Sequence, residues 1–151
     1  MSDYDTDTVL WSERQADLLR RMAAGERVNS AQLDWPNIAE EIEALGRSER
    51  SALRSHLAVV LEHLIKLQAS PAVTPRNGWK HSIRQGRGAI ERSLEDSPSL
   101  RPSVAGLIAH ETPRARANAA AAMNDYGERP RVDVSRLTFT EDQILGDWWP
   151  E

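Results

Sequence analysis

The chain contains no cysteine, and this absence excludes disulfides, thiol nucleophiles and thiolate metal ligands together. Aromatic residues are few: they make up 5% of the 151 residues, with five Trp but a single Phe. No uncharged apolar run approaches the ~18–20 residues that a transmembrane helix needs, so we expect no membrane span. The first seven residues are acidic and polar, the opposite of a signal peptide, and a cytoplasmic location is therefore expected.

The remaining composition is typical of a soluble globular protein. Hydrophobic residues make up 40% and charged residues 28%, which argues against disorder, and the length favours a single domain over residues 1–151. The net charge of −4 is uneven, since residues 1–49 carry −6 and residues 76–116 carry +4. Such a small basic excess, with acids interspersed, is not typical of nucleic-acid binding, so we do not expect a nucleic-acid partner.

Hydrophobic periodicity predicts helices along the chain. In the first periodic stretch, from Val9 to Ala24, one helical face carries Trp11, Gln15, Leu18, Leu19 and Met22. Asp7 or Thr8 is placed to cap its start, and Gly25 stands where a helix would stop. A mostly polar linker over residues 26–33 follows.

The longest pattern runs from Ile38 to Leu67. At about 100° per residue, its apolar positions fall within a sector of about 120°, and they are Ile38, Ile42, Leu45, Leu53, Leu57, Val60, Leu64 and Leu67. The phase does not reset at Gly46, so we predict one long helix from Pro36 to Ala69, with Asp34 as its cap. Two helices joined near Gly46 are the competing interpretation.

A further helix is predicted over Trp79 to Leu94, with a cap at or near Asn77. Gly86 and Gly88 weaken it. They flank an arginine, but the spacing matches neither the dinucleotide nor the nucleotide fingerprint. Close packing against a neighbouring helix is the simpler reason for glycine at these positions.

The next helix is expected to open at Ser97 or Ser99 and to continue through an alanine-rich run at 115–122. Pro113 lies within this pattern. A proline in a helix interior crowds the carbonyl four residues earlier, so we expect a kink or break near Ala109.

The C-terminal part is predicted to be a loop over residues 124–138, followed by a short helix over 141–145. Thr140 and Gln143 resemble a capping box at its start. The pair Trp148-Trp149 is expected to dock onto the body of the protein, whereas an exposed pair would mark a partner site. The predicted fold is therefore all-α: a single-domain helical bundle of about four to six helices with one long central helix.

Three polar residues interrupt the apolar face of the long helix. Glu49, His56 and His63 follow one another at steps of seven, which corresponds to ~10.5 Å of helix rise and is too long for one metal ion. A metal would require ligands from other helices, such as His81 or Glu91. We therefore expect no metal and no cofactor, and we leave open whether the three are a site or satisfied core residues.

The segment Leu33 to Glu49 (LDWPNIAEEIEALGRSE) resembles the signature of the bacterial "domain of unknown function 29" family, and so does Leu61 to Gln68 (LEHLIKLQ). The resemblance extends over residues 3–150 and implies an α-helical protein whose biochemical function is not established. It is less complete at Val134 to Thr140, where relatives have a loop with Pro and Cys, and at Leu67, where they often have an aromatic residue. The residues shared with the pattern are Glu40, Glu41, Gly46, His63, Lys66 and Trp79.

Two functional hypotheses follow. The absence of a catalytic motif, the long amphipathic helix and the tail pair Trp148-Trp149 favour a non-enzymatic domain that binds a protein partner or associates with itself. The sequence does not decide whether the protein is an enzyme. The alternative is a small-molecule- or metal-binding domain with a polar pocket around Glu41, His63, Trp79 and Arg87. Arg87 lies on the apolar face of its predicted helix, so it needs a partner if buried, and Glu41 is a candidate. Helix-dipole stabilisation near a helix start explains Glu41 equally well.

Overall fold

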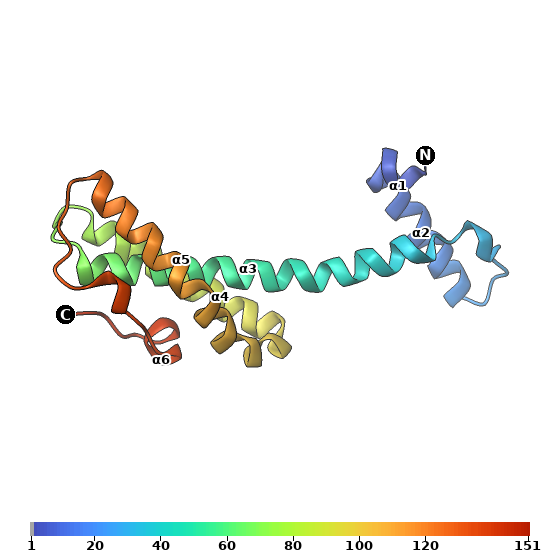
Figure 1. Cartoon of the computed structure of the whole chain (residues 1–151). Helices are drawn as coiled ribbons and strands as arrows, with labels where there is room; N and C mark the ends of the chain where they lie inside the picture. Colours follow the sequence, from blue (N-terminus) through green and yellow to red (C-terminus); the bar gives the residue numbers. More distant parts are fainter. Residues whose placement is uncertain (1) are drawn as a thin grey trace. The chain divides into compact units, whose positions relative to one another are not determined.

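The computed structural model describes residues 2–151, and over this range it contains six α-helices and no β-strand (Figure 1). The predicted all-α class is therefore confirmed. The α-helices are α1 (Asp3–Thr6), α2 (Thr8–Ala23), α3 (Trp35–Ala69), α4 (Arg76–Asp96), α5 (Val104–Asp125) and α6 (Glu141–Leu145). Short 3₁₀ helices lie between them: η1 (Ser30–Gln32), η2 (Pro98–Ser103) and η3 (Val134–Arg136). None of the helices in residues 2–151 is long and apolar enough to cross a membrane.

Contacts group the chain into two compact units, Met1–Ser48 and Glu49–Glu151, with the boundary inside α3. The first unit contains α1, α2, η1 and the beginning of α3, and the second contains the remaining elements. The expectation of a single domain over residues 1–151 stays a prediction.

The first unit is organised around Trp11. Its ring is buried and meets the ring of Tyr4 edge-on, with centroids 4.9 Å apart. Its indole N–H donates to the carboxylate of Asp34, at 3.0 Å. Asn37 also donates to this carboxylate, and the hydrogen bonds from Asn37 and Trp11 hold the pKa of Asp34 below its ordinary value. Asp34, predicted as a helix cap, thus ties the start of α3 to α2.

Local signals placed α2 correctly. The carboxylate of Asp7 accepts a hydrogen bond from the main-chain N–H of Leu10, as predicted for a cap. The chain leaves α2 at Gly25 with a φ of 83°, a conformation that glycine adopts without steric cost. The four-residue helix α1, with a capping box between Ser2 and Asp5, was not predicted.

Helix α3 is continuous from Trp35 to Ala69, with Gly46 inside it, so the interpretation as two helices is wrong. Its apolar face differs between the two units. In the second unit, the apolar residues of this face are buried, with exposed fractions of 0–1% for Leu53, Leu57, Val60, Leu64 and Leu67. In the first unit, Ile42 and Leu45 continue the same face but remain 64% and 69% exposed. Periodicity therefore predicted the apolar face of α3 but not which part of it is buried by other helices.

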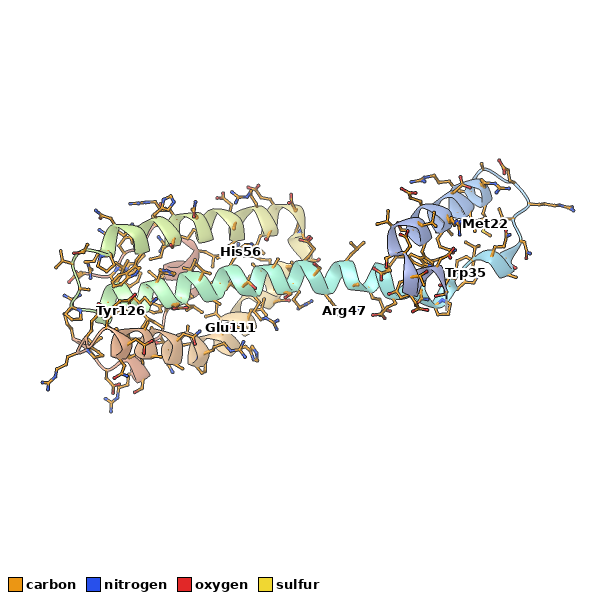
Figure 2. The ribbon with its side chains drawn as sticks, turned by 90° about the horizontal axis from the view of Figure 1, so that it is seen from above. Met22, Trp35, Arg47, His56, Glu111 and Tyr126 are labelled. Atoms are coloured by element: carbon orange, nitrogen blue, oxygen red, sulfur yellow. The ribbon has the colours of Figure 1, made fainter. Side chains whose placement is uncertain are left out.

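In the second unit, α4 and α5 lie on opposite sides of α3 (Figure 2), and residues from all three helices form one hydrophobic core. Gly86 on α4 allows the closest approach. A Cβ atom at this position would lie 2.6 Å from Cγ2 of the buried Val60 and 3.6 Å from the carbonyl oxygen of His56, both on α3. The predicted packing role is confirmed for Gly86. It does not extend to Gly88, where a Cβ would meet only Arg92 of the same helix.

Two helix starts differ from the prediction. Helix α4 begins at Arg76, with Pro75 rather than Asn77 at the N-cap. Residues 98–103, expected to open the next α-helix, form η2 instead, and α5 begins only at Val104. Pro102 explains this, because an α-helix beginning at Pro98 would need a main-chain donor at this position and proline has none.

Pro113 does not break α5, which continues through it. Residues on both sides of the proline are buried, among them Ile108 and Thr112 before it and Ala115 and Ala119 after it. Packing on both sides outweighs the loss of one helical hydrogen bond. The expected docking of the C-terminal tryptophans is confirmed, since Trp148 and Trp149 are partly buried against the core.

Gly86→Ala is expected to lower the free energy of unfolding by about 1–2 kcal/mol, because overpacking against the stiff, buried Val60 outweighs the gain in helix propensity. Gly106→Ala on α5 is the matched control. No atom lies within 4 Å of its Cβ position, so it is expected to stabilise by about 0.5–1 kcal/mol. Urea denaturation of both variants measures the difference, and an equal gain in both would contradict the close α3–α4 contact.

Candidate functional site

The four residues predicted to share a pocket are divided between the two units. Glu41 belongs to the first unit, where its carboxylate accepts a hydrogen bond of 2.6 Å from the hydroxyl of Tyr4. This hydrogen bond raises the pKa of Tyr4, because ionising the phenol would place two negative charges together. The contact ties α1 to α3, so Glu41 has a structural partner within its own unit.

The other three residues lie in the second unit, in different surroundings. His63 is half-buried, and its Nδ1 lies 2.7 Å from the carbonyl oxygen of Val59 on the same helix. Trp79 is also half-buried and lines a cavity of about 660 Å³ together with Lys66. Arg87 lines a different cavity. The pocket shared by all four residues stays a prediction.

The polar residues on the apolar face of α3 are not fully buried. Glu49 is exposed, and His56 and His63 are half-buried. Within residues 2–151, no group of three or more His, Asp or Glu side chains is placed to hold a metal ion. Because water can reach Glu49, His56 and His63, these side chains do not need the buried hydrogen-bonding partners that their positions on the apolar face suggested.

Arg87 makes the most extensive polar contacts of the four. Its Nε donates to the carbonyl oxygen of Ile144 at 2.9 Å, and its Nη2 donates to those of Gln143 and Trp148 at 2.8 and 2.6 Å. Gln143 and Ile144 lie in the last turn of α6, where main-chain carbonyls have no partner within the helix. The guanidinium thus caps α6 and holds the segment that follows it, which is a role that the sequence did not predict.

The C-terminal tryptophan also covers Arg87. The ring of Trp149 lies 4.9 Å from the guanidinium carbon of Arg87 and 5.2 Å from that of Arg84, both within the range of a cation–π contact. Burial lowers the pKa of Arg87, and the nearby charge of Asp147 opposes this shift. The guanidinium keeps its charge, since the ordinary pKa of arginine is far above neutrality.

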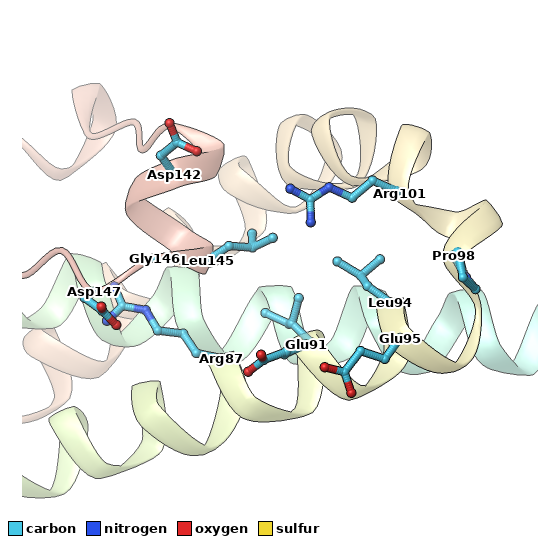
Figure 3. A pocket seen from close by; sticks show the side chains of 11 residues that line it. Arg87, Glu91, Leu94, Glu95, Pro98, Arg101, Asp142, Leu145, Gly146 and Asp147 are labelled. Atoms are coloured by element: carbon cyan, nitrogen blue, oxygen red, sulfur yellow. The ribbon is translucent and has the colours of Figure 1, made fainter.

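Docking of the C-terminal segment forms one wall of a groove of about 820 Å³, shown in Figure 3. The groove lies between α4 and η2 on one side and α6 with the residues after it on the other. Its apolar lining includes Ile90, Leu94 and Leu145, while four carboxylates line it as well: Glu91, Glu95, Asp142 and Asp147. Because two segments far apart in sequence create the groove, the periodicity of either one gave no sign of it.

Fold and geometry together define an all-α protein with one long helix, a C-terminal segment held by Arg87 and a charged groove. A family model described as "Domain of unknown function DUF29" matches residues 4–149, and the chain belongs to this family. The resemblance of the sequence to this family is thereby confirmed. No curated protein matches the chain, and no solved structure matches it.

Arg87→Met is expected to lower the free energy of unfolding by about 3 kcal/mol, because it removes a charged donor from three main-chain carbonyls. The tail tryptophans should then become more exposed, with a red shift in fluorescence. Arg92→Met is the control, since Arg92 is exposed on the same helix and its replacement should change stability by no more than about 0.5 kcal/mol. Identical melting of the two variants would contradict the capping role.

Proposed function

We propose that this chain is a cytoplasmic, non-enzymatic protein-interaction domain that associates with a second copy of itself through the exposed part of α3. One observation carries the proposal: Trp35, Ile42 and Leu45 lie on the apolar side of α3 and are 49%, 64% and 69% exposed. We call these three residues the α3 stripe. Further along the same helix, the apolar residues of the same face, from Leu53 to Leu67, are buried.

The residues of the α3 stripe lie along one side of the helix. From Trp35 to Leu45 the helix rises about 15 Å, and at about 100° per residue the three side chains project to one side. Contiguous exposed apolar patches mark interaction sites in soluble proteins. The continuation of this face already packs against helices in the second unit, which supports helix packing as its mode of contact.

The charges near the stripe favour a second copy as the partner. Arg47 forms ion pairs with Glu40 and Glu43, at 2.5 and 3.7 Å, and these residues project from the opposite side of the helix from Ile42 and Leu45. Two copies can therefore bring Ile42 and Leu45 together across a two-fold axis with these ion pairs turned away from the contact. An antiparallel pair also opposes the helix dipoles favourably.

Small residues border the α3 stripe and permit close approach. Ala39 and Gly46 lie at its edge, and no atom lies within 4 Å of the Cβ position of Gly46. The alternative pocket around Glu41, His63, Trp79 and Arg87 has less support. Glu41 is occupied by Tyr4, and two of the guanidinium nitrogens of Arg87 are occupied by main-chain carbonyls.

Sedimentation velocity over a wide concentration range tests the proposal. The unmodified chain is expected to dimerise with a Kd of about 10–100 µM, because the stripe is smaller than a standard interface. The double substitution Ile42→Ser with Leu45→Ser removes most of its apolar surface and should weaken dimerisation at least about tenfold.

Val9→Ser with Val73→Ser is the control, because both valines are comparably exposed, at 69% and 80%, and lie outside the stripe. The control variant is expected to dimerise as the unmodified chain does. A strict monomer at every concentration would contradict self-association, and equal weakening in both variants would contradict the assignment to the α3 stripe.

A further inference from the structure

The groove of about 820 Å³ is distinct from the α3 stripe and lies wholly in the second unit. We call it the carboxylate groove, defined by Glu91, Glu95, Asp142 and Asp147 around an apolar lining. In Figure 3, Leu94 and Leu145 lie between Asp142 and the two acidic residues of α4, while Asp147 lies beside Arg87. Leu94 and Leu145 are partly buried and pack on the core, which holds the apolar lining of the groove in place.

In residues 2–151 the carboxylates of Glu91, Glu95 and Asp142 form no ion pair, whereas that of Asp147 lies near enough to Arg87 to interact with its charge. In the part of the chain that the structure describes, no hydrogen bond engages the side chains of these four residues. Two basic residues, Arg87 and Arg101, also line the groove, so its four carboxylates outnumber its positive charges. Arg87 donates to three carbonyls, and Nε of Arg101 lies 3.6 Å from Glu141, which is outside the groove lining. The groove therefore presents an excess of negative charge.

The end of α4 gives an independent reason to expect a cation here. A helix C-terminus carries partial negative charge, so acidic residues in its last turn are unfavourable unless compensated. The last turn of α4 contains Glu95 and Asp96 and no basic residue. A positively charged group bound in the groove would offset the unfavourable interaction of Glu95 with the C-terminal end of α4. It would also offset the negative charge of the groove carboxylates.

From this charge complementarity we infer that the carboxylate groove binds a basic amphipathic peptide segment of a partner protein. Lysine or arginine side chains of the segment would reach the carboxylates, and an aliphatic side chain would cover Leu94 and Leu145. Lys and Arg suit such a site because their apolar stems can lie along the leucines while their charged ends stay at the rim. A metal ion fits less well, since the described residues offer no cluster placed to hold one.

Fluorescence anisotropy with a labelled peptide built of leucine and lysine tests the inference. The unmodified protein is expected to bind this peptide and not its leucine–glutamate counterpart, and binding should weaken as salt is raised. Glu91→Gln with Glu95→Gln keeps the shape of the groove and removes two charges, so the Kd should rise about fivefold.

Glu13→Gln with Asp125→Asn is the matched control, because it removes the same charge from two exposed positions outside the groove. Its Kd should stay within about twofold of the unmodified protein. An equal loss of peptide affinity in both variants would overturn the inference, because binding would then follow net charge alone. An absence of peptide binding to the unmodified protein would overturn it as well. If spermidine displaced the labelled peptide at the concentration at which unlabelled peptide does, the groove would be a site for small cations, and the inference of a peptide site would be overturned. Neither variant alters the α3 stripe, so dimerisation remains a separate test.

Discussion

The apolar face of α3 is the constraint on which the rest of the structure depends. Where α4 and α5 cover it, residues such as Leu53 and Leu57 are fully buried, and each contributes about 1.5–3 kcal/mol through loss of contact with water. The second unit is built on this burial. In the first unit the same face continues through Leu45 and Ile42, and no helix in residues 2–151 covers these residues. The proposed function follows from this difference in burial between the two parts of α3. One helix thus supplies both a core and an exposed surface.

Arg87 holds α6 and the residues after it against α4 within the second unit. Arg87 projects from α4 into carbonyls that the short helix α6 cannot satisfy alone, and Trp149 covers the guanidinium. A five-residue helix has little stability of its own, so this contact and the packing of Trp148 fix its position. The wall of the carboxylate groove follows from the same contact. The shape of the carboxylate groove therefore depends on the hydrogen bonds that Arg87 donates to the C-terminal segment.

Sequence periodicity and capping residues were enough to predict most helices, because these signals are local. The long helix, the cap at Asp7 and the capping box of α6 are of this kind. Predictions that depended on tertiary packing were less successful. Pro113 was expected to disrupt a helix that packing keeps continuous, and Arg87 was expected to need a carboxylate but found main-chain carbonyls. Periodicity also cannot tell whether Ile42 has a neighbour, and it cannot place α6 beside α4 to form a groove.

The central claim is that the exposed part of α3 becomes covered when two chains meet. Hydrogen exchange along α3, measured at low and high protein concentration, tests this claim residue by residue. Amides around Ile42 and Leu45 are expected to exchange more slowly as concentration rises, because a dimer protects this part of the helix. Amides around Leu57 and Leu64, already within the core, should not change. Exchange around Ile42 that is independent of concentration would contradict self-association through the α3 stripe.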